Sequence, residues 1–340
     1  MPEPKREQPK VEQQDSQEVR PILEASPAER VAETPSEITP AEKERQIEEL
    51  RAEVEKITDS TPPAETKTED KEVKQAKIKQ YQERHLPEYI KDRGRIAKML
   101  TNFWVGPEDF KKEGAENIPE KGPFIVVSNH FGGNDAEAII KTFKNTDLHF
   151  AVAKEMWWNS SPIQKWILQK FGMIPVEESL SNLTEQEKEE ALQRQGGNGK
   201  KVFRKIIDRE KQGKVATNIE FIHQAVATLL RGDALGVFPE GLWLNPGGMG
   251  KSAREKKELK QGYRGIELIA SQYQKLTGEE LPIIPTAFIR DESTGEKKVI
   301  VGQPLKLSEN ESENNGTDWC MKHVAEMLPE EQRGYYKDKE

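Results

Sequence analysis

The chain has 340 residues, a charged fraction of 33% and a formal net charge of −8 at pH 7. The acidity is local: residues 1–70 hold 10 basic and 19 acidic side chains, whereas residues 71–340 hold 42 and 41. This nearly neutral body excludes nucleic-acid binding that is driven by bulk positive charge. The single cysteine, Cys320, excludes an internal disulfide and predicts a reducing, cytoplasmic compartment.

Residues 1–85 are predicted to be an N-terminal tail outside the folded domain. Residues 1–38 are rich in Pro, Glu, Gln and Ser and poor in aromatic residues, a composition typical of disorder. A charged helical stretch is predicted at 71–84. The sequence shows neither an apolar signal core after Met1 nor a run of about 18 apolar residues, so any membrane association is predicted to be peripheral.

A basic amphipathic segment at 87–105 opens the predicted domain. Its apolar residues Ile96, Leu100 and Phe103 fall on one helical face. The basic residues between them are Lys91, Arg93, Arg95 and Lys98. Such a helix can lie on an anionic membrane surface, and it can equally pack on the domain with a solvated basic face. The sequence leaves both interpretations open.

Strands and helices alternate over residues 86–328, which predicts one α/β domain with a mixed, mainly parallel sheet flanked by helices. The predicted strands are 124–127, 148–153, 173–176, 234–238, 281–289 and 298–301, and the predicted helices are 135–143, 157–171, 218–230, 253–276 and 317–328. The highly charged residues 178–215 are interpreted as an inserted surface segment, helical on both sides of a turn at Gly196–Gly199. Residues 329–340 are predicted to be a C-terminal tail.

The loop after the first of these strands carries His130 and Asp135. Loops at the carboxyl ends of parallel strands are where α/β sheets place their chemistry. A histidine can remove a hydroxyl proton near neutral pH, and a carboxylate can fix its tautomer. Between the two, Gly132 and Gly133 would let backbone N–H groups approach an oxyanion. Taken alone, a histidine and an acid at this spacing also occur in purely structural roles.

A second candidate is Phe238-Pro239-Glu240-Gly241, again at the end of a predicted strand. Its carboxylate can bind substrate hydroxyls, or the segment can be a turn with a solvated glutamate. The glycine-rich stretches near Lys200 and Lys251 lack the spacing of a phosphate-binding loop. No Cys/His cluster predicts a metal site. The remaining histidines, His85, His149, His223 and His323, have no partner at a telling spacing.

Together these residues resemble the four sequence blocks of the glycerolipid (lysophosphatidate-type) acyltransferases. In order, the blocks are Asn129-His130 with Asp135, Gly172–Val176, Phe238–Gly241 and Pro282–Pro285. The resemblance covers about 86–328 and implies a glycerol-3-phosphate acyltransferase-like fold. It also implies transfer of a fatty acyl group from acyl-CoA or acyl-carrier protein to the hydroxyl of a lysophospholipid or related glycerolipid. The implied role is phospholipid biosynthesis at a membrane surface, with no metal and no cofactor beyond the thioester.

The same resemblance assigns roles to residues. His130 would be the general base and Asp135 would orient it. The acceptor-binding residues would be Glu240 and Gly241 with Pro239. Lys154 lies in a segment, Ala153-Lys154-Glu155, that is similar to a further element of the family. We therefore add Lys154, Gly132 and Gly133 as candidate substrate-binding residues.

The sequence departs from the family at two positions that bind the acceptor phosphate. The family has an arginine after the second block, where this chain has Glu177 and Glu178. The family continues its third block with Thr-Arg-Ser, where this chain has Leu242-Trp243-Leu244. An acceptor without a phosphomonoester is therefore an open alternative. So are a non-catalytic lipid-binding or tethering protein of the same fold, and a hydrolase that uses water as the acceptor.

Overall fold

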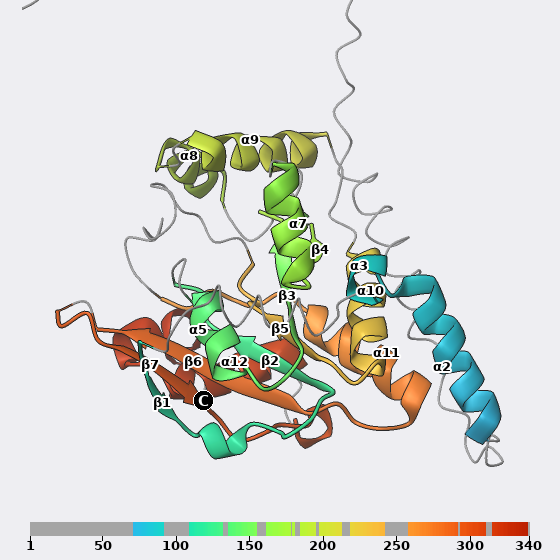
Figure 1. Ribbon diagram of the computed structural model, residues 1–340. Coiled ribbons are helices and arrows are strands. Elements are labelled where there is room, and N and C mark those ends of the chain that lie inside the picture. The colour runs from blue at the N-terminus through green and yellow to red at the C-terminus, as the bar shows by residue number, and fades with distance from the viewer. Residues whose placement is uncertain are drawn as a thin grey trace, which may run out of the picture. The chain divides into compact units, whose positions relative to one another are not determined.

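A seven-stranded sheet forms the centre of the computed structural model (Figure 1). The structure describes residues 71–91, 109–131, 135–154, 161–177, 179–180, 184–194, 197–212, 218–241, 258–291, 293–310 and 315–338. The strands are β1 (Lys111–Glu113), β2 (Phe124–Ser128), β3 (Leu148–Ala153), β4 (Ile174–Val176), β5 (Ala234–Val237), β6 (Ile283–Arg290) and β7 (Lys297–Val301). Their order across the sheet is β1-β7-β6-β2-β5-β3-β4.

The sheet is mixed and mainly parallel, as the sequence predicts. Strands β6, β2, β5, β3 and β4 run in one direction. Strand β7 is antiparallel to β6, and β1 pairs in parallel with β7. The prediction missed β1, because its sequence Lys-Lys-Glu carries no apolar signal. A short, charged strand of this kind is suited to the edge of a sheet, where it discourages further pairing.

Helices cover both faces of this sheet. The helices are α2 (Lys71–His85), α3 (Glu88–Lys91), α5 (Asp135–Thr142), α7 (Pro162–Lys170), α8 (Glu185–Arg194), α9 (Gly197–Lys211), α10 (Ile219–Leu230), α11 (Gly265–Thr277) and α12 (Gly316–Glu326). The described residues also form four short 3-10 helices: η1 (Ala115–Asn117), η2 (Leu307–Glu309), η3 (Glu330–Gln332) and η4 (Gly334–Tyr336). Most predicted helices are confirmed, including both helices of the 178–215 segment. The predicted helix 157–171 is observed as α7, and its first part, 157–160, lies outside the described residues. Helix α9 already begins at Gly197, inside the stretch that the sequence analysis interpreted as a turn, and 195–196 lie outside the described residues.

The two faces are covered by different helices because side chains alternate along each strand. In β2, Ile125 and Val127 join the cluster that contains the buried sides of α10, α11 and α12. Phe124 and Val126 point to the opposite face, where they pack in a cluster with residues of α5. All four of these side chains are buried. A central strand buried on both faces explains why β2 reads as a continuous apolar run.

The helix predicted from residue 253 begins later than expected. Residues 258–264 are not helical, α11 starts at Gly265, and 253–257 lie outside the described residues. The backbone before Gly265 forms hydrogen bonds with distant parts of the chain. The Leu259 N–H donates to the Gln332 carbonyl, and the Leu259 carbonyl accepts from the Tyr335 N–H. The Lys260 N–H donates to the carboxylate of Glu240. These bonds compete with the helical hydrogen bonds that the sequence pattern suggested.

Two segments that the sequence analysis placed outside the domain contact it. Helix α2 packs against α10 and α11, and its Tyr81 hydroxyl lies 2.5 Å from Nδ1 of His223. Near the other end of the chain, Tyr336 is buried and its hydroxyl donates to Asp318. Residues 1–70, and the part of the amphipathic segment from 92 to 105, lie outside the described residues. Within the described ranges, no helix is long and apolar enough to cross a membrane.

A buried charge network ties β3 to β5 at the amino edge of the sheet. His149 has a fully buried side chain whose Nδ1 lies 2.9 Å from the Gly172 carbonyl and whose Nε2 lies 3.1 Å from Asp233. Each ring nitrogen of His149 therefore faces an oxygen atom that accepts hydrogen bonds. Arg231 also donates to the Asp233 carboxylate. The sequence analysis assigned no partner to His149, because Asp233 is 84 residues away.

Replacing Asp233 with asparagine is expected to lower the free energy of unfolding by about 2–3 kcal/mol at pH 7. Burial raises the pKa of the Asp233 carboxyl, but the hydrogen bond and charge of His149 and the charge of Arg231 outweigh it and hold that pKa below its ordinary 3.8. The wild-type stabilisation is therefore complete above this ordinary value and is lost as pH falls through the lower folded-state pKa.

Urea unfolding of the wild type and of Asp233→Asn, at neutral pH and at successively lower pH, measures both effects. The matched control is Asp208→Asn, because Asp208 is exposed on α9. If Asp233→Asn is no less stable than this control, the network does not hold β3 to β5 as described.

Candidate active site

The loop after β2 is anchored to the neighbouring strand by Asn129. The side-chain amide nitrogen of this fully buried residue donates to the Phe288 carbonyl at 2.9 Å. Its amide oxygen accepts from the Phe288 N–H at 2.8 Å. The amide thus continues the pairing of β2 with β6 for one more step beyond the strand. This pair of bonds fixes the backbone immediately before His130.

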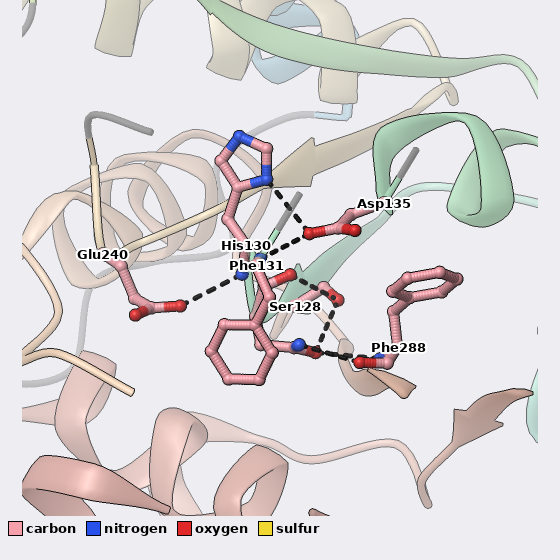
Figure 2. Close-up of polar contacts among 7 residues, drawn as sticks. Ser128, His130, Phe131, Asp135, Glu240 and Phe288 are labelled. Carbon is pink, nitrogen blue, oxygen red and sulfur yellow. Dashed lines mark hydrogen bonds and ion pairs between the residues drawn. The ribbon is translucent and has the colours of Figure 1, made fainter. Parts of the chain in front are cut away.

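His130 and Asp135 lie together, as the sequence predicts. Nδ1 of His130 is 3.3 Å from an oxygen of Asp135, and the same oxygen accepts the Phe131 N–H at 2.5 Å (Figure 2). The Asp135 side chain is 2% exposed and stands in the first turn of α5, where the helix dipole favours an anion. A proton on Nδ1 that faces this carboxylate leaves the lone pair on Nε2.

The plane of the His130 ring is set by Phe238, a residue whose role the sequence analysis missed. The two rings stack with centroids 4.3 Å apart and planes 13° apart, and Phe238 in turn stacks on Phe150. The imidazole is therefore held by a carboxylate at one nitrogen and by an aromatic face, while 17% of its side chain stays exposed. The other ring nitrogen points away from Asp135 (Figure 2). That nitrogen can meet a substrate hydroxyl.

Glu240 lies beside His130 because β5 is the direct neighbour of β2 and the two strands are parallel. One of its carboxylate oxygens accepts the His130 N–H at 3.0 Å, and the other accepts the Lys260 N–H at 2.8 Å. The residue is only 6% exposed. Glu240 thus joins two loops that are far apart in the sequence. Its predicted contact with the acceptor stays a prediction.

The other predicted residues of this segment shape the turn. Gly241 has a φ of +75°, which favours glycine, and its N–H donates to the Phe238 carbonyl. The carbonyl of Pro239 accepts the Tyr263 N–H at 2.9 Å. Gly132 and Gly133 lie outside the described residues. Among the residues that the structure describes, no three His, Cys, Asp or Glu side chains gather as a metal site would require.

Lys154 stands at the carboxyl end of β3, at the same edge of the sheet as His130. Its ammonium donates to Glu177 at 3.0 Å, and Arg209 of α9 approaches the other oxygen of Glu177 at 3.9 Å. Glu177 occupies the position after the second block, and its backbone is held in both directions by the side chain of Asn218. The side chains of Lys154 and Arg209 are therefore both close to the carboxylate of Glu177.

The base in this arrangement that can remove a proton from a substrate is His130. A base with a fixed tautomer and a fixed ring plane faces outward from the carboxyl edge of the sheet, and charged side chains lie two and three strands away. Adjacent strands are about 4.8 Å apart, so Lys154 and Glu177 start roughly 10–15 Å from the His130 backbone. A substrate with a reacting hydroxyl and a polar headgroup of several ångströms fits this spacing.

Comparison with known proteins identifies the family. The acyltransferase family model matches residues 109–289. No curated protein sequence matches the chain significantly. The crystal structure of the 1-acyl-sn-glycerophosphate (LPA) acyltransferase PlsC from Thermotoga maritima is similar at 16% sequence identity and a TM-score of 0.40, covering 76% of this chain and 80% of that one. The family match spans more than half of the 340 residues and includes His130, Asp135 and Glu240, so the chain belongs to the acyltransferase family.

Proposed function

We propose that this protein is an O-acyltransferase that moves a fatty acyl group from acyl-CoA or acyl-carrier protein to the free hydroxyl of a lysophospholipid or related glycerolipid. Nε2 of His130 takes the hydroxyl proton as the oxygen attacks the thioester carbonyl carbon. The tetrahedral intermediate then collapses, the C–S bond breaks, and the thiol leaves with the proton from the imidazolium. Because the oxygen attacks the thioester directly, the reaction needs no covalent enzyme intermediate and no metal ion.

The main support for this proposal is the environment of His130 in a chain that belongs to the acyltransferase family. Its Nδ1 faces the buried carboxylate of Asp135, its ring is stacked on Phe238, and part of the side chain is exposed. A histidine held in this way is prepared to accept a proton at Nε2. We propose that the protein binds peripherally to a membrane, because the acceptor and the product are lipids. We propose the cytoplasmic side, because a chain with a single cysteine suits a reducing compartment.

Acyl transfer from labelled acyl-CoA and from acyl-carrier protein to a panel of lysolipids tests the function. The expected result is an acylated lipid with release of the free thiol. Thiol release without an acylated lipid would indicate a hydrolase. Tight lipid binding without turnover on any acceptor would indicate a non-catalytic binding or tethering protein, the alternative suggested by the carboxylates at Glu177 and Glu178.

The preference of the enzyme for one acceptor headgroup over another is expected to depend on Glu177. This carboxylate is paired with Lys154 and lies near Arg209, so it competes with an acceptor phosphate for both cations. Replacing Glu177 with glutamine is expected to raise the preference for lysophosphatidate over a zwitterionic lysolipid by about fivefold, roughly 1 kcal/mol. The effect is modest because the Lys154–Glu177 ion pair is partly solvated. Initial rates with the two acceptors measure the ratio. The control is Glu189→Gln on the exposed side of α8, and an unchanged ratio for Glu177→Gln would place the phosphate elsewhere.

A further inference from the structure

Helix α7 exposes apolar side chains in a way that the rest of the described protein does not. Four large apolar residues are exposed among the described residues: Val73, Ile163, Trp166 and Tyr335. Ile163 is 71% exposed and Trp166 is 51% exposed. They are three residues apart on α7 and so lie on one side of the helix. Single exposed apolar residues are ordinary, but two large neighbours on one helix form a patch.

This helix is firmly formed although it buries little of its surface. Ser161 and Gln164 form a reciprocal capping box at its start, with Pro162 at the first helical position. Every residue from Pro162 to Lys170 is at least partly exposed. A helix that connects two parallel strands usually packs an apolar side on the sheet. In α7, Ile167 and Leu168 are partly buried, whereas Ile163 and Trp166 face outward.

The charges on α7 favour a particular partner. The segment Pro162–Lys170 contains two lysines and no acidic residue. The ammonium of Lys170 lies 5.8 Å from the centre of the Trp166 ring. Tryptophan rings settle at the level of lipid headgroups, and lysines beside them keep their charge in water near anionic lipid. Trp, Ile and Lys on one short helix therefore match an anionic bilayer surface better than a protein groove.

The topology connects this helix to the candidate active site. The parallel strand β3 ends at the carboxyl edge of the sheet, and the chain must return to the amino end of β4. Helix α7 lies on this return, so its first turns, with Ile163 and Trp166, are nearer the carboxyl edge than its last turn. The same edge carries His130. A bilayer bound at α7 would lie on the side of the molecule where the base is located.

We propose that Ile163, Trp166 and the two lysines of α7 form a docking surface for an anionic lipid bilayer. Ile163 and Trp166 enter the headgroup region, while Lys165 and Lys170 contact anionic headgroups. Helix α3, the described part of the basic segment at 87–105, contacts α7, but the four residues of this surface do not belong to that segment. It does not depend on the acyl acceptor, and vesicle binding needs no turnover, so its failure and a failure of the proposed activity are distinguishable.

Co-sedimentation of the full chain with vesicles tests the surface. Vesicles of phosphatidylglycerol and phosphatidylcholine are compared with vesicles of phosphatidylcholine alone. The double variant Ile163→Ser/Trp166→Ser is expected to reduce binding to the anionic vesicles at least about tenfold. The control Val73→Ser, which removes an exposed apolar residue of α2, is expected to bind as the wild type does. Equal binding of the double variant and the wild type would overturn the proposal.

A fluorescent label makes the test independent of sedimentation. The single native cysteine, Cys320, is fully buried, and burial raises the pKa of its thiol to about 12, so it does not compete for a thiol reagent. An environment-sensitive dye attached through Ile163→Cys is expected to emit in the red-shifted range in solution and to shift to the blue on anionic vesicles. Blue-shifted emission already in solution would mean that another part of the chain or a second copy covers α7, and would overturn the proposal.

Discussion

Replacing His130 with alanine is expected to lower the rate constant of acyl transfer by about 10²–10⁴-fold, the usual contribution of a general base. The variant removes the only atom that we assign to proton abstraction. The loop should keep its shape, because Asn129 still pairs with Phe288 and the backbone N–H of residue 130 still reaches Glu240. The free energy of unfolding is expected to fall by only about 1–2 kcal/mol, because the stacking on Phe238 and the bond to Asp135 are lost. Single-turnover acyl transfer and urea unfolding, measured on one preparation, give both quantities.

The matched control for this variant is His323→Ala. His323 lies on α12, is one third exposed, and pairs with Glu326 of the same helix. Its removal deletes an imidazole from the surface and should leave acyl transfer unchanged. Full activity of His130→Ala would exclude the proposed base and would leave lipid binding without catalysis as the better explanation. Loss of activity in both variants would point to unfolding, which the urea measurement detects.

The fold and the central pair were predictable because their signals are local in the sequence. Strand β2 is a short apolar run, which a strand buried on both faces requires. His130 and Asp135 are five residues apart, so a single strand–loop–helix turn brings them together. The edge strand β1 has only lysines and a glutamate, and its pairing with β7 could not be read from its own composition.

The support around His130 was not predictable from spacing, because it comes from distant parts of the chain. Glu240 is 110 residues from His130, and Phe288 is 159 residues from Asn129. Such contacts follow from the order of strands in the sheet, which places β5 and β6 on the two sides of β2. The four-block resemblance groups Asn129, His130 and Glu240, but it does not include Phe288, and it carries no information about which atom bonds to which. For Glu240, the hydrogen bonds seen in the structure suggest a different role from the one that the resemblance implies.

Replacing Glu240 with glutamine is expected to destabilise the protein by about 1–3 kcal/mol and to lower kcat by about 10²-fold. The two carboxylate oxygens accept one backbone N–H each, from His130 and from Lys260. A glutamine offers one acceptor oxygen, and its NH₂ group would face the second N–H, donor against donor. The displaced loop would move the His130 backbone, and a shift of about 1 Å at the reacting group is enough for such a loss.

The division between kcat and KM separates two roles for Glu240. If Glu240 mainly binds acceptor hydroxyls, as the family resemblance implies, Glu240→Gln should raise the KM for the acceptor and leave the free energy of unfolding unchanged. If it mainly holds the two loops together, stability and kcat should fall together while KM changes little. The exposed Glu326→Gln serves as the control. The hydrogen bonds and the 6% exposure of Glu240 favour the second outcome, in which the glutamate acts on the reaction through the backbone of His130.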